Sequence, residues 1–245
     1  MRKGNHGICI LLESYYPVLG VMESQALILN KTLKESHVNI RVITRHVESR
    51  SEKEEYIDGI YVKRISPSGY GMFKKWIMVI TSMFYLIENV FNYDTIFVYG
   101  FRSLGIAGVL ISKIFRKHCV LKASNIGEMS GEYFDTGLGH LGLSKNFLLY
   151  RILLNLRNDL LMKADAFVSF SPKITNEFKN CRIKSEKIFE IPNLFDEEQF
   201  YKVTHTEKIE LKNRLNLPLN KKILIYTGRL TLEKGLPLLL KDGMK

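Results

Sequence analysis

The feature that most limits the fold is an uninterrupted apolar run close to the N-terminus, residues 8–12 with the sequence ICILL. A strand with one solvated face alternates apolar and polar residues, whereas a strand covered on both faces of a parallel sheet is apolar throughout. Further strand-like runs follow, separated by stretches with helical spacing; they cover residues 38–44, 60–65, 94–100, 120–123 and 164–171. This alternation predicts an α/β fold, a parallel sheet with helices on both faces.

The composition is that of an ordinary globular protein, with 46% hydrophobic and 25% charged residues in a chain of 245. The net charge of +11 is spread through the sequence in short pairs such as Lys74 and Lys75, with no long basic tract. Such a distribution favours anionic small ligands or an anionic membrane surface as partners. It argues against nucleic acid as a partner, since a binding arm would concentrate the charge.

The three cysteines, Cys9, Cys119 and Cys181, are far apart and match no CxxC or Cys/His spacing. We therefore expect neither a disulfide framework nor a zinc site, and no motif implies a cofactor or a metal. The first apolar run is not followed by a signal-peptide cleavage site, and no window has the roughly 18 apolar residues of a membrane span. These observations predict a cytoplasmic protein, with peripheral attachment to the cytoplasmic face of a membrane as an open alternative.

Near the C-terminus, residues 223–235 have the sequence ILIYTGRLTLEKG. The first five of these are apolar, β-branched or aromatic, which predicts a buried strand. Arg229 and Lys234 then flank the expected start of a helix, where unpaired N–H groups and the helix dipole already favour anions. We predict a diphosphate-binding site there. A solvated helix start in which Glu233 lies beside the lysine is the competing interpretation.

The segment GRLTLEKG resembles the G-R-L-x-x-x-K-G motif of family 4 glycosyltransferases, which have two Rossmann-like domains and the GT-B fold. Other stretches resemble motifs of that family in the same order: PVLGVME at 17–23, a strand ending in Thr44, DTIFVYG at 94–100, ADAFVSFS at 164–171 and IPNLFDEEQF at 191–200. The resemblance implies that Gly20, Arg229 and Lys234 contact the diphosphate of a nucleotide-sugar donor. It also implies a saccharide or lipid-linked acceptor.

Four sites depart from the family pattern, in which glycine or histidine is frequent: Val21, Tyr99, Leu194, and the neighbours Ser124 and Asn125. The resemblance implies that a histidine near the last site would contact the transferred sugar, so the catalytic residues are unknown, with Ser124 and Asn125 as candidates. Either side chain can hydrogen-bond a sugar hydroxyl, but neither is a base near neutral pH. The retaining mechanism of the family is usually described without a protein base, because the leaving diphosphate helps to deprotonate the acceptor.

A polar loop with glycines begins directly after the strand predicted at 120–123. In doubly wound sheets ligands bind at the carboxyl ends of the strands, which makes this loop a candidate acceptor site. We assign Lys122, Gly127 and Glu128 to it, together with Glu23 from the earlier motif. The loop is long enough to be mobile and functional, since it continues to about residue 142.

Two of the expected helices pose a question of orientation. Over residues 72–91 apolar side chains recur at three- and four-residue steps; they are Phe73, Trp76, Ile77, Ile80, Phe84, Ile87 and Phe91. This stripe predicts a helix that packs on the sheet, or else a surface helix whose aromatic and basic residues rest on a membrane with lipid-linked acceptors. Over residues 146–162 the pattern predicts inward leucines and places Arg157 on the outward side.

We divide the chain into an acceptor-type Rossmann-like domain at 1–200 and, at 201–245, a linker with the truncated start of a donor-binding domain. The E-x7-E segment of the family is missing from the second part, so Arg229 and Lys234 have no opposite wall. We expect the chain to be a truncation product, a frameshift product, or half of a split enzyme whose complementary chain carries the donor domain.

The leading hypothesis is a retaining, nucleotide-sugar-dependent glycosyltransferase of cell-surface polysaccharide or glycolipid biosynthesis, inactive or incomplete as this chain alone. The alternative is a non-catalytic module that binds a membrane or an acceptor and that remains after loss of the donor domain. A nicotinamide-dependent dehydrogenase is disfavoured, because no G-x-G-x-x-G follows the first strand.

Overall fold

The computed structural model of the protein describes residues 7–48, 51–69, 71–131, 148–228, 230 and 234–243. The chain forms two compact units, Met1–Asp196 and Glu197–Lys245. The acceptor and donor roles that the sequence suggests for 1–200 and 201–245 stay predictions.

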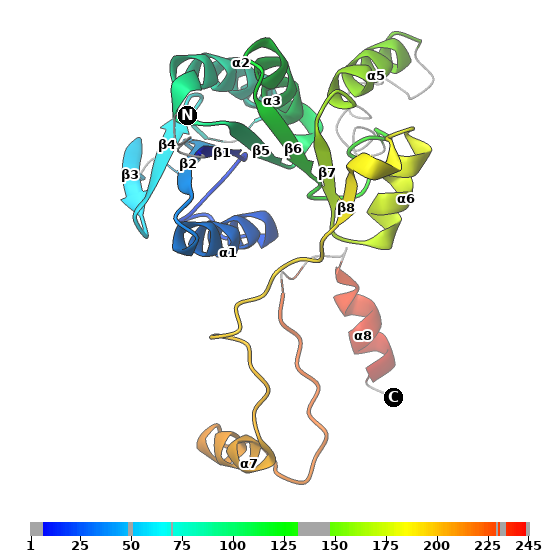
Figure 1. Ribbon diagram of the computed structural model, residues 1–245. Helices are drawn as coiled ribbons and strands as arrows, with labels where there is room; N and C mark the ends of the chain where they lie inside the picture. Colours follow the sequence, from blue (N-terminus) through cyan, green and yellow to red (C-terminus); the bar gives the residue numbers. More distant parts are fainter. Residues whose placement is uncertain are drawn as a thin grey trace. The chain divides into compact units, whose positions relative to one another are not determined.

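The first unit contains an eight-stranded sheet in the order β3-β4-β2-β1-β5-β6-β7-β8 (Figure 1). The strands are β1 (Gly7–Leu11), β2 (Asn39–Arg45), β3 (Glu54–Ile57), β4 (Ile60–Ile65), β5 (Thr95–Tyr99), β6 (His118–Lys122), β7 (Ala166–Ser169) and β8 (Ile188–Glu190). Neighbouring strands run parallel except β3 and β4, a hairpin closed by Asp58 and Gly59 with φ of 50° and 74°. The predicted Rossmann-like α/β fold is confirmed.

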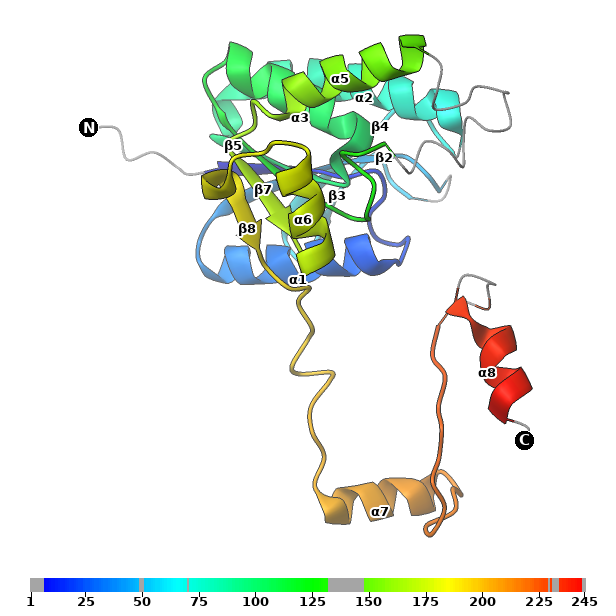
Figure 2. The same cartoon turned by 90° about the vertical axis from the view of Figure 1, so that its right-hand side faces the viewer.

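Helices cover both faces of this sheet (Figures 1 and 2). They are α1 (Val21–Glu35), α2 (Met72–Glu88), α3 (Phe101–Ile114), α5 (Leu148–Leu161) and α6 (Pro172–Asn180), with short 3-10 turns η1 (Val90–Asn92) and η4 (Ser185–Lys187). The blue helix α1 lies on one face and buries a core cluster that includes Ile10, Val42 and Tyr99. The helices α2, α3 and α5 lie on the other face, over a larger cluster.

The helix α3 approaches its neighbours closely because of two glycines. A Cβ at Gly105 would lie 2.8 Å from Leu161 Cδ2, and one at Gly108 would lie 2.7 Å from Val98 Cγ2. Real Cβ atoms do not come so near, so these positions require glycine. The close packing of α3 against β5 and α5 therefore depends on these two glycines.

The orientation predicted for α5 is wrong. Leu156 is 61% exposed and Ile152 is also exposed, whereas Arg157 is only 8% exposed. The Arg157 guanidinium donates hydrogen bonds to the backbone carbonyls of Glu128 and Met129. Hydrophobic periodicity cannot anticipate this, because a buried cation that hydrogen-bonds backbone oxygens takes a position that the pattern reserves for an apolar side chain.

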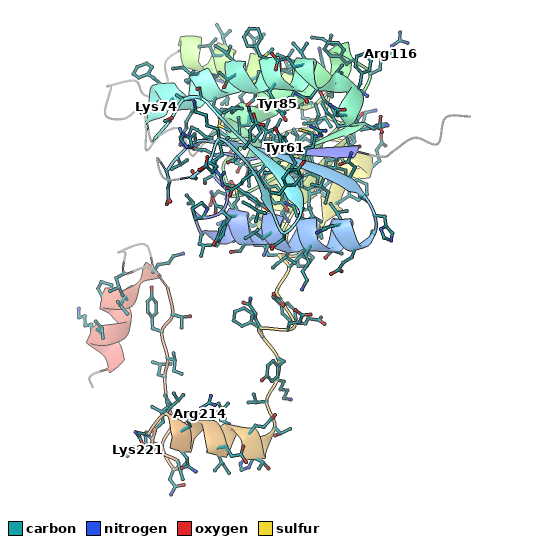
Figure 3. All side chains as sticks on the ribbon, turned by 90° about the vertical axis from the view of Figure 1, so that its left-hand side faces the viewer. Tyr61, Lys74, Tyr85, Arg116, Arg214 and Lys221 are labelled. Atoms are coloured by element: carbon teal, nitrogen blue, oxygen red, sulfur yellow. The ribbon has the colours of Figure 1, made fainter. Side chains whose placement is uncertain are left out.

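The orientation of α2 also differs from the simpler expectation. The helix does pack on the sheet, but through Met78, Val79, Tyr85 and Leu86, and Figure 3 shows Tyr85 beside Tyr61 of β4. The predicted apolar stripe, which begins at Phe73, is solvent-exposed instead. The helix has apolar residues on two sides, so the sequence period alone could not show which side faces the core.

The second unit contains two helices among its described residues, α7 (His205–Arg214) and α8 (Leu236–Gly243). Helix α7 begins after Thr204, which forms a capping box with Glu207. The strand predicted at 223–227 is absent. A single strand leaves its backbone N–H and C=O groups unpaired, and the described part of this unit offers no second strand for pairing.

Candidate functional site

A small pocket lies where β1, β5 and β6 end at the carboxyl edge of the sheet. Its volume is about 150 Å³. It is lined by Glu13, Met22, Lys75, Gly100, Arg102, Ser103, Leu104, Ser124, Asn125 and Glu128. The predicted residues Ser124, Asn125 and Glu128 thus come together at the edge of the sheet where α/β proteins bind ligands.

Gly100 brings the walls of this pocket together. It follows β5 directly, forms the N-cap of α3 and has a φ of 64°. A Cβ in its place would lie 3.1 Å from both Met22 Sδ and Ser124 Oγ. Glycine is favoured here for two reasons, because the left-handed backbone is strained for other residues and the neighbouring side chains leave little space.

Glu128 organises the polar end of the pocket. Its Oε1 accepts hydrogen bonds from the Ser124 hydroxyl, from the Ser124 N–H at 2.9 Å and from the Asn125 N–H at 3.2 Å. Its Oε2 is buried and has no hydrogen-bond partner among the described residues. Burial raises the pKa of Glu128, and these hydrogen bonds with the nearby Arg102 charge offset that only in part.

The loop that carries Glu128 is clamped from two helices. The Glu177 carboxylate of α6 accepts the N–H groups of Gly127 at 2.8 Å and of Met129 and Ser130 at 3.0 Å each. Arg157 of α5 binds carbonyl oxygens of the same loop. The backbone of the loop is therefore fixed by charged side chains, which positions Glu128 at the pocket.

Another part of the pocket wall carries a carboxylate that is paired with two cations. Glu13 Oε1 lies 2.9 Å from Arg45 Nη2, and Glu13 Oε2 lies 3.1 Å from Lys75 Nζ. Arg102 adds a further cation at the rim. A ligand that enters here meets carboxylates and cations at once, which suits a polyhydroxylated molecule better than an apolar one.

The catalytic candidates differ in what they can offer a ligand. The Ser124 hydroxyl proton is committed to Glu128, which leaves its oxygen as an acceptor. Asn125 is exposed, and its Nδ2 makes one long bond of 3.4 Å to Ser124 Oγ. The Asn125 amide is therefore the better placed of the two to bind a ligand hydroxyl, and neither becomes a base in this setting.

Other predicted site residues lie outside the pocket. Gly20 is the N-cap of α1, where Glu23 is buried and accepts a hydrogen bond from Ser14. Lys122 ends β6, and its Nζ lies 5.9 Å from the Tyr99 ring centroid. Burial lowers the pKa of Lys122. The Gly127 N–H is already bound to Glu177.

The predicted diphosphate site cannot be assembled from the described residues. Arg229 lies outside them, and so does Glu233. Lys234 belongs to the second unit and is exposed. Its role as a phosphate ligand stays a prediction, as does that of Gly20.

Several charged residues that build the pocket were not predicted from the sequence. Glu13 follows the first strand by two positions, and Lys75 lies in the first turn of α2, but neither stands in a recognisable motif. Glu177 and Arg157 reach the loop across 48 and 28 residues of chain. Polar residues on otherwise amphipathic helices are a weak signal, so only the position of Glu13 at a strand end could have indicated this role.

Within the described ranges, no group of three His, Cys, Asp or Glu side chains could hold a metal ion. In the same ranges no helix is long and apolar enough to cross a membrane. The three cysteines are free thiols, and burial raises the pKa of Cys9 and of Cys119 to about 12 each.

The comparison with solved structures gives consistent matches. A sucrose-phosphate synthase from Thermosynechococcus elongatus is 16% identical with a TM-score of 0.67, and the match covers 96% of this chain and 59% of that one. HepE from Anabaena, solved in complex with UDP and glucose, is 20% identical with a TM-score of 0.61, covering 96% and 57%. WaaG, a glycosyltransferase involved in lipopolysaccharide biosynthesis, is 12% identical with a TM-score of 0.60, covering 96% and 58%.

No protein-family model matches the sequence, and neither does any curated protein. The chain spans somewhat more than half the length of the solved structures above. At these identities the likeness concerns the fold. The chain has the Rossmann-like α/β fold found in glycosyltransferases of the GT-B type.

Proposed function

We propose that this chain supplies the acceptor side of a retaining, nucleotide-sugar-dependent glycosyltransferase of the family 4 type. The observation that carries the proposal is the pocket at the carboxyl edge of β1, β5 and β6, where Ser124, Asn125 and Glu128 converge. The fold of the matched glycosyltransferases and the order of the sequence motifs support it. The protein would act in the cytoplasm, in cell-surface polysaccharide or glycolipid biosynthesis.

The pocket is small, as we expect if this unit forms only part of a binding site and a donor domain forms the rest. Its volume of about 150 Å³ is below the roughly 300–1,000 Å³ of complete ligand pockets. The exposed Asn125 amide can orient a sugar hydroxyl, and the Ser124 oxygen, whose proton is donated to Glu128, can accept a hydrogen bond from another. We assign the acceptor, a saccharide or a lipid-linked saccharide, to this wall.

The donor belongs to the other side of the proposed site. One matched protein was solved with UDP-glucose and with UDP, and the cations Arg229 and Lys234 suit such a diphosphate. A diphosphate held only by solvated cations binds weakly at physiological salt. We therefore propose that the donor half is completed by further sequence or by a complementary chain.

Isothermal titration with UDP-sugars and GDP-sugars tests the donor proposal. We expect no measurable binding by the chain as given, and binding by a version extended with a complete second domain. Sugar transfer by the extended protein would establish the activity. Acceptor binding without any transfer would instead establish the alternative, a non-catalytic acceptor-binding module.

The assignment of the acceptor wall has its own test. Asn125→Ala should weaken acceptor binding about tenfold, since it removes hydrogen bonds to a ligand hydroxyl. Asn155→Ala, on the exposed side of α5, is the matched control and should have no effect. Equal acceptor affinity of the two variants would place the acceptor elsewhere.

A further inference from the structure

The helix α2 presents an apolar surface to solvent along its whole length. We call this the α2 surface, and it consists of Phe73, Trp76, Ile77, Ile80, Phe84 and Ile87. Phe73 is 79% exposed and Phe84 is 64% exposed. Their spacing of three and four residues places all six on one side of the helix. Scattered apolar residues are normal on a protein surface, but a continuous stripe marks an interaction site.

The α2 surface is not left over from core packing. The opposite side of the helix carries Met78, Val79, Tyr85 and Leu86, which are buried in the main core cluster. The helix is thus already anchored to the sheet without using the stripe. An amphipathic helix needs only one apolar side for this purpose, so the second apolar side requires another explanation.

Basic side chains lie at both ends of this helical layer. Lys74 lies in the first turn of α2, and Arg116 follows the end of α3 and is exposed. Figure 3 shows the two residues at opposite ends of the layer that holds α2 and α3. A long apolar stripe with aromatic residues and cations at its ends is the arrangement of a helix that lies in the plane of a membrane.

We propose that the α2 surface docks on the surface of an anionic lipid bilayer. A second copy of the chain is a poorer partner, because a two-fold contact through α2 would bring the same cations near one another. The net charge of +11 further favours an anionic partner. From Phe73 to Ile87 the stripe extends over about 21 Å of the helix, which matches an extended flat surface.

The same helix reaches the candidate site. Lys75, the next residue after Lys74, lines the pocket and pairs with Glu13. Docking through α2 would therefore hold the acceptor wall close to the bilayer. This link rests on the proposed function, and it indicates an acceptor that is itself anchored in the membrane. Docking of the α2 surface on a bilayer does not itself depend on sugar transfer.

The chain contains its own reporter, because Trp76 is its one tryptophan and lies on the α2 surface. We expect vesicles of phosphatidylcholine with phosphatidylglycerol to shift Trp76 emission to the blue, and brominated lipid to quench it. Vesicles of phosphatidylcholine alone should do neither at the same salt. The same vesicles should co-sediment with the protein, and added salt should release it.

Matched variants locate the contact. Phe84→Ser should lower the vesicle partition coefficient about tenfold, whereas Tyr56→Ser, an equally exposed aromatic on β3, should leave it unchanged. Arg116→Gln should weaken binding more than Arg182→Gln, since both arginines are exposed and have positive φ but only Arg116 lies in the α2 layer. Circular dichroism confirms that each variant is folded.

The proposal fails if the protein shows no preference for anionic vesicles, or if Phe84→Ser and Tyr56→Ser behave alike. A dimer that Phe84→Ser dissociates, without vesicle binding, would show that a second copy covers the surface. These experiments do not measure sugar binding or transfer. The membrane proposal can therefore fail while the proposed function holds, and the proposed function can fail while the membrane proposal holds.

Discussion

Replacing Glu177 with alanine should loosen the loop that carries Glu128. The carboxylate accepts three backbone N–H groups at 2.8 to 3.0 Å, and hydrogen bonds to charged groups contribute about 1.5–3 kcal/mol each. Water can replace the bond to the exposed Ser130, but Gly127 and Met129 are buried. We therefore expect the free energy of unfolding to fall by about 2–4 kcal/mol, the contribution of the two buried bonds after partial relaxation.

Urea denaturation followed by circular dichroism measures this loss, and hydrogen exchange locates it. The amides of Gly127 and Met129 should exchange faster in Glu177→Ala than in the wild type, because they open with the loop. Glu186→Ala is the matched control. Its side chain is 74% exposed and pairs with Lys184 at 3.7 Å, so its removal should cost at most about 0.5 kcal/mol.

A Glu177→Gln variant separates charge from geometry. The glutamine carbonyl can still accept hydrogen bonds, but its NH2 group would face a backbone N–H, so we expect a loss of stability between those of the wild type and the alanine variant. The reasoning is refuted if Glu177→Ala and Glu186→Ala lose equal stability and leave the loop amides equally protected.

Three further predictions concern single sites. Gly108→Ala should lower the free energy of unfolding by about 1–3 kcal/mol, because the new Cβ meets Val98 Cγ2, and adding Val98→Ala should recover part of the loss in the same urea assay. Gly100→Ala should lower it by about 1–2 kcal/mol through its left-handed backbone, with a lower melting temperature as the readout. Asp165 accepts hydrogen bonds from Lys113 Nζ and the Cys119 N–H, which outweigh burial and lower the pKa of Asp165. Its stabilising effect is complete above the unfolded pKa and is lost as pH falls through the folded pKa, so the stability gap between wild type and Asp165→Asn should shrink from pH 7 to pH 3, and a constant gap would contradict this.

The fold was predictable because its strands have strong local signals. Residues 8–12 and 94–100 are apolar runs bounded by turns, and they form β1 and β5 at the centre of the sheet. The Asp58 and Gly59 pair is typical of a hairpin turn, and both residues take the positive φ that this turn requires. The strand predicted at 223–227 has an equally apolar sequence, but the described residues of its unit include no second strand for pairing, which indicates that pairing decides whether such a run becomes a strand.

The position of the site was predictable, but its construction was not. The rule that ligands bind at the carboxyl ends of strands grouped Ser124, Asn125 and Glu128, and the structure places all three in one pocket, whose role as a binding site stays a prediction. The clamp by Glu177 and Arg157 depends on contacts between distant parts of the chain, which hydropathy does not encode. The orientation of α2 was ambiguous for a different reason. Both sides of that helix are apolar, so the spacing of apolar residues does not show which side faces the core.

The departures from the family 4 pattern are connected to one another in space. The Tyr99 hydroxyl donates a 3.4 Å hydrogen bond to the backbone oxygen of Gln25, while the Gln25 side chain binds both the N–H and the C=O of Leu194 at 2.6 and 2.7 Å. Neither Val21 nor Leu194 has a positive φ, so neither backbone position requires the glycine that is frequent there.

Gln25 therefore links β5 to the IPNLFD segment through α1, and it does so at two of the substituted positions. At a third substituted position, the Ser124 hydroxyl donates a hydrogen bond to the Glu128 carboxylate in the pocket. A histidine at 124 could not make this hydrogen bond in the same way. At positions 99, 124 and 194 the substituted residues therefore have specific hydrogen-bond partners within the first unit. A buried polar side chain such as Gln25 would be costly without such partners, so the residues at 99 and 194 fit it rather than vary independently of it.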